Sequence, residues 1–212
     1  MKKEVADIRK NYSLQTLEEK DVAADAMEQF TKWWQQAISS EIDEVNAMML
    51  ATASLDGKPS ARIVLLKDYN ANGFVFFTNY TSNKGYALDA NPNAALTFFW
   101  KELERQIRIE GVAEKVSAIE SDEYFYSRPV GSRIGAWASP QSNVIESRKL
   151  LDENVEKYNK LFEENVPRPE HWGGYRVKPV SIEFWQGRSN RLHDRLRYTK
   201  TNNEWKIERL AP

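Results

Sequence analysis

The sequence AMMLATASLDGKPSARIVLLK, residues 47–67, has the pattern of a β-hairpin and decides the fold class. Apolar residues dominate 47–54 and return in 60–67, and Asp56-Gly57 between them supplies the positive φ angles of a tight hairpin turn. A second turn, at 70–73, leads into FVFFT, residues 74–78, which is typical of a third strand. Strands joined by such short turns predict an antiparallel meander, not a βαβ unit.

The remainder of the chain mixes helical patterns with further strand patterns. Apolar residues recur at helical spacing from Asp25 to Ser40, which predicts an amphipathic helix with Asp25 near its start. Further helical segments are expected at 82–90, at 121–127 with Ser121 as the cap, at 132–138 and at 144–162. Further strands are expected at 94–100, 106–116, 177–186 and 205–210, with an irregular loop at 167–174. About seven mostly antiparallel strands with interspersed helices predict a mainly antiparallel β fold, a barrel core decorated by helices.

The composition limits the functional classes. The 212 residues carry a formal net charge of −1, from 30 basic and 31 acidic side chains, which argues against a nucleic-acid-binding protein. The chain has no cysteine and only two histidines, so no metal site is expected. No apolar run could span a bilayer and MKKEVADIRK lacks a signal-peptide core, so we expect a cytoplasmic protein with no membrane partner. The polar pattern of 1–20 predicts a flexible segment, followed by one domain at 21–212.

The segment WQGRSNRLHDR, residues 185–195, concentrates three arginines and a histidine. If it is extended, Arg191, His193 and Arg195 share one face, because strand side chains repeat every two residues. Two guanidinium groups beside an imidazole suit an anionic ligand, since arginine matches phosphate or carboxylate and histidine can donate, accept or move a proton. A solvated, charged edge strand explains the same pattern.

Several smaller polar clusters could also bind anions. Thr78, Ser82 and Lys84 at a strand-to-helix junction could seat a phosphate, although Ser82 alone is as well explained as a helix cap. A second set offers a phenol, a guanidinium and a hydroxyl, which suits a phosphate ester, at Tyr124, Arg128 and Ser132. Arg62 and Lys67 are expected on opposite faces of one strand. The amide of Gln106 could pair with the edge of a heterocycle, although such a glutamine usually faces solvent.

Five long motifs in order resemble the pyridoxamine 5′-phosphate oxidase family. They are ARIVLLK (61–67), FTNYTSNKG (77–85), ERQIRIEG (104–111), YFYSRPVGSRIGAWASPQS (124–142) and EFWQGRSNRLHDR (183–195). The resemblance implies an FMN-binding split β-barrel and a homodimer with FMN at the subunit interface. It also implies an oxidase that converts pyridoxamine 5′-phosphate and pyridoxine 5′-phosphate to pyridoxal 5′-phosphate, with O2 reduced to H2O2.

The resemblance further assigns roles to residues of this chain. Arg191 and His193 would be catalytic. The segment from Arg9 to Tyr12 loosely matches a region that can contact substrate or product. The FMN site would comprise Arg62, Ile63, Val64, Leu65, Leu66, Lys67, Phe77, Thr78, Ser82, Asn83, Lys84, Gln106, Gln141, Ser142, Trp185 and Arg195, of which Gln141 and Ser142 would reach from the partner subunit. The substrate site would comprise Lys67, Tyr124, Arg128, Ser132, Arg191, Leu192 and His193.

One position departs from the family pattern. Asn83 stands where the family often has an arginine just before Lys84, so one charged contact to the FMN phosphate would be missing. We therefore expect weaker FMN binding than in relatives with arginine. Two other readings keep the fold: a flavin- or pyridoxal-phosphate-binding carrier without turnover, and a reductase that uses another flavin-like cofactor.

Overall fold

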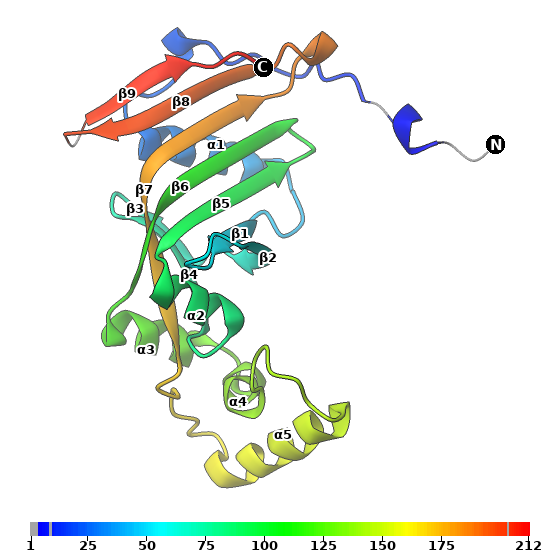
Figure 1. Cartoon of the computed structure of the whole chain (residues 1–212), viewed down its shortest axis with the longest axis vertical. Coiled ribbons are helices and arrows are strands. Elements are labelled where there is room, and N and C mark those ends of the chain that lie inside the picture. Colours follow the sequence, from blue (N-terminus) through cyan, green and yellow to red (C-terminus); the bar gives the residue numbers. More distant parts are fainter. Residues whose placement is uncertain (1–3, 9, 203) are drawn as a thin grey trace. The chain divides into compact units, whose positions relative to one another are not determined.

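The computed structural model describes residues 4–8, 10–202 and 204–212. These residues form nine strands in one mostly antiparallel sheet, in the order β2-β1-β5-β6-β7-β4-β3, with β8 paired to β7 and β9 to β8 (Figure 1). The strands are β1 (Ala47–Ala53), β2 (Pro59–Leu65), β3 (Asp68–Asn70), β4 (Gly73–Asn79), β5 (Asn93–Trp100), β6 (Arg105–Lys115), β7 (Trp172–Gln186), β8 (Asp194–Thr201) and β9 (Glu204–Arg209). The mainly antiparallel β fold is as predicted.

The described residues also form five α-helices and three short 3₁₀ turns. The helices are α1 (Ala26–Ser39), α2 (Asn83–Ala90), α3 (Ala118–Ser127), α4 (Val130–Ala138) and α5 (Arg148–Phe162). The 3₁₀ turns are η1 (Val5–Asp7), η2 (Glu19–Asp21) and η3 (Ser189–Arg191). Within the described ranges, none of these helices combines the length and the apolar character needed to cross a membrane.

The chain divides into two compact units, and strands β1, β5, β6 and β7 contribute residues to both. The first unit contains the described residues of 1–49, 95–110 and 179–212. Its core forms where the apolar face of α1 meets β7, with the rings of Trp33 and Phe184 at 5.2 Å. Asp25 caps α1 by accepting a hydrogen bond from the N–H of Met27 at 2.7 Å, as the sequence predicted. This unit therefore supplies a rigid base for the β7–β8 connection.

The second unit contains residues 50–94 and 111–178. Helices α4 and α5 pack together in it, with the ring of Trp137 at 5.0 Å from that of Phe162 (Figure 1). A cluster of buried side chains, Phe125, Ile134, Val166 and Trp172, ties these helices to α3 and to the start of β7. Packing of this kind fixes the ends of β4, α3 and α4 relative to one another within the unit.

The predicted meander of three strands is wrong at β4. The strand β4 pairs with β7 and β3, and Phe74 lies opposite Val177. The physical reason is burial, because β4 is buried on both faces and such a strand is favoured inside a sheet, with a neighbour on each edge. Its partner β7 begins at Trp172, inside the segment predicted as an irregular loop. Gly174 fits there because a Cβ at this position would lie 2.8 Å from the ring of Phe77.

Two helix starts also differ from prediction. Helix α3 begins after Ser117, not at Ser121, because Ser117 and Glu120 form a reciprocal capping box. Ser121 instead accepts a hydrogen bond from the N–H of Gly174 at 3.3 Å. Helix α5 begins at Arg148 after Ser147, four residues later than the apolar pattern from Val144 suggested. The division into a flexible segment 1–20 and one domain 21–212 stays a prediction, and Arg9 lies outside the described residues.

Candidate functional site

A cationic cradle forms where β4 ends and α2 begins, within the second unit. Lys84 Nζ donates hydrogen bonds to Thr78 Oγ1 at 3.1 Å, to Ser82 Oγ at 3.1 Å and to Gln141 Oε1 at 2.8 Å. Ser82 also caps α2, so the helix-cap interpretation of this serine is confirmed, and its part in seating a phosphate stays a prediction. Gln141 thus lies beside Lys84 of its own chain, and its contribution to the flavin pocket of the partner subunit stays a prediction. The sequence-predicted set at this junction is brought together.

The cradle has an excess of positive charge. Arg62, on β2, donates to neutral acceptors, Thr52 Oγ1 at 2.9 Å and the carbonyl of Leu50 at 3.3 Å. Burial lowers the pKa of the Lys84 ammonium, and the nearby Arg62 guanidinium lowers it further. Among the described residues, neither cation has a carboxylate partner. Two neighbouring, partly buried cations without a counter-charge favour an anionic ligand.

An aromatic platform lies next along the same unit. The ring of Tyr124 stacks on Phe77 at 4.1 Å, and Phe77 stacks on Trp172 at 5.5 Å. Lys67 Nζ lies 5.7 Å from the centre of the Tyr124 ring, and the Arg128 guanidinium lies 4.7 Å from that of Trp172. The platform therefore holds one cation over each of two stacked rings. Sequence reasoning missed Trp172, because Pro167–Gly174 resembled a loop.

A pocket of about 240 Å³ opens beside this platform. Its lining joins the predicted substrate residues Arg128 and Ser132 to Gln141 of the cradle, together with Asn79, Gly135, Ala136, Ser139 and Trp172. Arg128 Nη1 is buried and has no hydrogen-bond partner, and burial lowers the pKa of this guanidinium. An unpaired buried donor is costly unless a ligand supplies the acceptor. The pocket is therefore suited to a small anionic group.

The Arg/His segment lies in the first unit, as the loop between β7 and β8. The extended arrangement is wrong here, because Ser189–Arg191 forms a 3₁₀ turn and β8 begins only at Asp194. Positive φ angles at Asn190 (56°) and Arg191 (62°) turn the chain, so Arg191 does not alternate in a strand with Arg195. The loop, with Tyr12 and Lys10, lines a pocket of about 610 Å³ that contains both Arg191 and His193.

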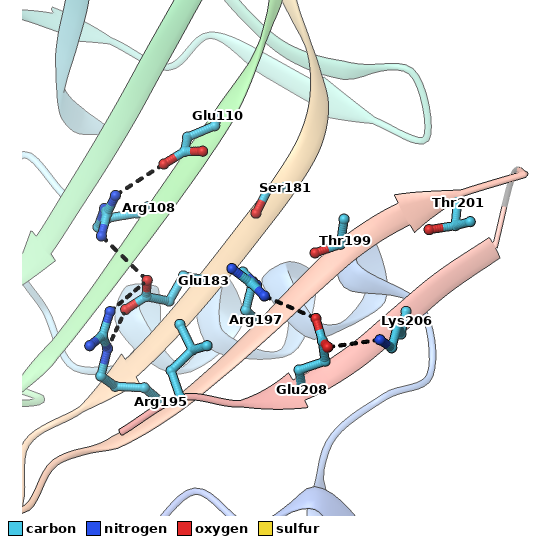
Figure 2. Close-up of a pocket in the computed structure, with 11 residues that line it drawn as sticks. Arg108, Glu110, Ser181, Glu183, Arg195, Arg197, Thr199, Thr201, Lys206 and Glu208 are labelled. Carbon is cyan, nitrogen blue, oxygen red and sulfur yellow. Dashed lines mark hydrogen bonds and ion pairs between the residues drawn. The ribbon is translucent and has the colours of Figure 1, made fainter. Parts of the chain in front are cut away.

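Arg195 behaves differently from the cations of the cradle. It donates to both carboxylate oxygens of Glu183, at 2.8 and 3.1 Å, and this partner raises its pKa. Figure 2 shows the surrounding pocket of about 550 Å³, in which basic and acidic side chains alternate across the sheet. The pairs lie within 3.3 Å and are Arg108–Glu110, Arg108–Glu183, Arg195–Glu183, Arg197–Glu208 and Lys206–Glu208. The charges that line this pocket are paired with one another. The pocket is therefore less suited to an anionic ligand than the cradle is.

The remaining predicted residues fall on both units. Ile63, Val64 and Leu65 lie in β2, and Leu66 is buried just after it, in the second unit. Asn83 is exposed at the first position of α2, and Ser142 follows Gln141 with a φ of 72°. Gln106 and Trp185 are half-buried on β6 and β7, and Leu192 is exposed in the loop, all in the first unit. Sequence reasoning missed Glu183, Arg188 and Asp194, whose charges looked like ordinary surface charges.

Comparisons with known proteins identify the family. Residues 34–162 match the family described as pyridoxamine 5′-phosphate oxidase, and 172–212 match its C-terminal dimerisation region. A protein named pyridoxine/pyridoxamine 5′-phosphate oxidase from Trichormus variabilis is 55% identical over 100% of both chains. One of the same name from Burkholderia lata is 57% identical over 98% of this chain and 99% of its own.

Solved structures agree on the fold. PhzG from Burkholderia lata, crystallised with tetrahydrophenazine-1-carboxylic acid, has a TM-score of 0.89 at 32% identity and covers 96% of this chain and 100% of its own. A Nostoc punctiforme protein described as pyridoxamine 5′-phosphate oxidase-related and FMN-binding has a TM-score of 0.70 at 14% identity, covering 90% and 100% of the two chains, and supports the fold alone. The split β-barrel expectation is confirmed by these neighbours. With family matches over most of its length and relatives above half identity, the chain belongs to the pyridoxamine 5′-phosphate oxidase family, a family of oxidoreductases.

Proposed function

We propose that this protein is an FMN-dependent oxidase that converts pyridoxamine 5′-phosphate and pyridoxine 5′-phosphate to pyridoxal 5′-phosphate, with O2 reduced to H2O2. One observation carries the proposal. Among the described residues, two sets of cations in the second unit have no carboxylate partner, Lys84 with Arg62 and the partly buried Arg128, and Gln141 lies beside both. A phosphorylated cofactor beside a phosphorylated substrate would satisfy both sets.

The cradle fits the phosphate of FMN. Lys84 and Arg62 would pair with its charge, while the hydroxyls of Thr78 and Ser82 and the N–H groups at the start of α2 would donate to its oxygens. When bound, FMN would supply the two-electron acceptor for the substrate C4′ carbon and pass the electrons to O2. The protein itself would supply position and charge.

The substrate phosphate would bind at the aromatic platform. Arg128 Nη1 has an unused donor for it, Ser132 lines the same pocket, and Lys67 and Tyr124 lie together at the platform. Fixing the phosphate orients the pyridine ring, and fixed orientation is a large part of catalysis in such reactions. The amine substrate would be oxidised to an imine, which water hydrolyses to the aldehyde and ammonia. The alcohol substrate would give the aldehyde directly.

The residues of the first unit would complete the site in a homodimer. The match of 172–212 to a dimerisation region supports two copies of the chain, and FMN would bind at their interface. Trp185, Gln106 and Arg195 would then border the cofactor. Arg191 and His193 would lie against the substrate ring, where they can orient it and stabilise charge that develops during oxidation.

Turnover tests the proposal directly. Purified protein with FMN and pyridoxine 5′-phosphate in air should form aldehyde and H2O2 in equal amounts. We expect Arg191→Ala and His193→Ala each to lower kcat/KM by roughly 100-fold while FMN affinity stays nearly unchanged, because both side chains act on the substrate. Full activity in both variants would refute their assignment. No product despite a flavin-bound spectrum would refute the oxidase and favour a carrier.

The PhzG neighbour defines a second candidate function. Its ligand, tetrahydrophenazine-1-carboxylic acid, is a carboxylate, whereas the proposed substrates are phosphate esters. Arg128 can pair with either anion, so binding alone does not distinguish the two functions. Supplying the phenazine compound in the same assay shows which of the two substrates is oxidised. Oxidation of the phenazine with no oxidation of pyridoxine 5′-phosphate would replace our proposal with that activity.

Asn83 gives a prediction about cofactor affinity. It is exposed at the start of α2, next to Lys84, so an arginine there could add a charged hydrogen-bond pair to the FMN phosphate. We expect Asn83→Arg to tighten FMN binding by about tenfold or more. A titration followed by flavin fluorescence measures this, with riboflavin, which lacks the phosphate, as the control. Equal FMN affinity in the wild-type protein and in Asn83→Arg would refute this prediction.

A further inference from the structure

The carboxylate of Asp194 connects three segments of the first unit. Its Oδ2 accepts hydrogen bonds from Arg188 Nη1 at 2.8 Å and from the N–H of Leu17 at 3.1 Å, and its Oδ1 accepts one from Arg209 Nη1 at 2.9 Å. The Asp194 side chain is only 13% exposed. Charge-assisted hydrogen bonds to a mostly buried carboxylate are strong and directional. Asp194 therefore has the contacts of a fixed structural hub.

The hub closes the loop that carries the proposed catalytic residues. Arg188 lies near the start of the β7–β8 connection and Asp194 is the first residue of β8, so their ion pair spans the loop from end to end. Between them, Asn190 and Arg191 both have positive φ angles. Backbone of this kind costs about 1–3 kcal/mol per residue and persists only where surrounding contacts hold it. The Arg188–Asp194 pair is the charged contact among those that hold it, beside the hydrogen bond from Ser189 Oγ to the carbonyl of Tyr12 at 3.2 Å.

The same loop fixes the proton on His193. The backbone N–H of Arg188 points at His193 Nδ1, with the two nitrogens 3.0 Å apart. A backbone N–H can only donate, so Nδ1 must be the unprotonated nitrogen of the neutral ring and the proton must lie on Nε2. The ring also packs against Trp185 at 4.5 Å and Tyr12 at 6.0 Å. Burial, and next the Arg191 guanidinium, lower the pKa of His193, which favours this neutral form.

We infer that Asp194 is a positioning residue, which holds the 187–193 loop so that His193 presents Nε2–H, and Arg191 its guanidinium, to the bound substrate. The inference rests on the proposed function and adds a role for His193, that of a fixed hydrogen-bond donor. Asp194 also belongs to a wider ion network, in which Arg209 pairs with Glu19. The role proposed for Asp194 concerns its pair with Arg188 and not this outer part.

Kinetics of the FMN-loaded, full-length protein test the inference. Asp194→Asn keeps the size of the side chain but removes its charge, and we expect kcat/KM for pyridoxine 5′-phosphate to fall about 10- to 100-fold with FMN affinity within about twofold. Asp194→Glu should recover part of the loss. Glu19→Gln is the matched control, because it breaks the Arg209 pair without touching the loop, and it should retain kcat/KM within about twofold. Equal losses in the Asp194→Asn and Glu19→Gln variants would indicate general destabilisation and overturn the inference.

Imidazole nitrogen NMR gives a readout that needs no turnover. The chain has two histidines, His171 and His193, so a His171→Gln variant assigns their signals. We expect one neutral tautomer with the proton on Nε2 of His193, and exchange between tautomers in Asp194→Asn. If Asp194→Asn does not fold, Arg188→Gln removes the same ion pair at a partly exposed position and should give the same exchange. An unchanged single tautomer in the variant that folds would overturn the inference, whereas a wild-type protein without turnover would overturn only the proposed function.

Discussion

Replacing Lys84 with methionine is expected to weaken FMN binding by roughly 10- to 100-fold and to leave riboflavin binding nearly unchanged. The ammonium donates to Thr78, Ser82 and Gln141, which are all neutral acceptors, so its charge remains available to an anion. A phosphate that enters the cradle gains this charge together with that of Arg62. Methionine keeps most of the apolar stem and removes only the charge and the donors.

The FMN-free protein should not lose much stability from this change. Burial and the neighbouring Arg62 lower the pKa of Lys84, so the folded protein disfavours the charged ammonium in the absence of a ligand. The variant loses the three hydrogen bonds that Nζ donates, which destabilises it, and also loses the repulsion between Lys84 and Arg62, which stabilises it. We therefore expect the free energy of unfolding without FMN to change little, while the stabilisation that FMN adds becomes smaller.

Lys178→Met provides the matched control for this prediction. Lys178 is in the same unit, pairs with Glu114 at 2.7 Å and is 55% exposed, so its loss should affect neither ligand. Fluorescence titrations of the three proteins with FMN and with riboflavin complete the comparison. If Lys84→Met weakened both ligands equally, its effect would come from distortion of the site, and the phosphate assignment would fail.

Local sequence signals predicted much of the fold and part of the site. The Asp25 cap and the Ser82 cap are each determined within a few residues, and the structure has both. The Asp56-Gly57 turn also forms, with a positive φ at Gly57 but not at Asp56. The grouping of side chains in the cradle was predictable for the same reason, because Thr78, Ser82 and Lys84 are brought together by one strand-to-helix junction.

Features that depend on distant pairing were not predictable in this way. The position of β4 beside β7 joins residues about 100 apart in sequence, and no local pattern encodes the partner of a strand that is apolar on both faces. Trp172 became part of the aromatic platform through that pairing. The loop around Arg191 is spanned by an ion pair, and the charges of Arg188 and Asp194 look like surface charges in the sequence. Long-range contacts therefore decided both of the corrections that affect the site.

Gly85→Ala is expected to lower the free energy of unfolding by about 3 kcal/mol, at the upper end of the usual cost of overpacking. A Cβ at Gly85 would lie 2.0 Å from the carbonyl oxygen of Tyr80 and 2.5 Å from its carbonyl carbon. Both atoms belong to the backbone, and Tyr80 is held on two sides, since its N–H donates to the carbonyl of His171 and its hydroxyl to that of Gly174. The turn cannot move aside without breaking these contacts.

Helix propensity alone predicts the opposite sign for this substitution. Alanine is favoured over glycine inside a helix by about 1 kcal/mol, and Gly85 lies in α2. Gly131, in α4, is the matched control because a Cβ there meets nothing within 4 Å, so Gly131→Ala should stabilise the protein by up to about 1 kcal/mol. Urea denaturation of both variants without FMN measures the contrast. If Gly85→Ala were as stable as Gly131→Ala, the tight junction between β4 and α2 would not exist, and the cradle that holds Lys84 would lose its structural basis.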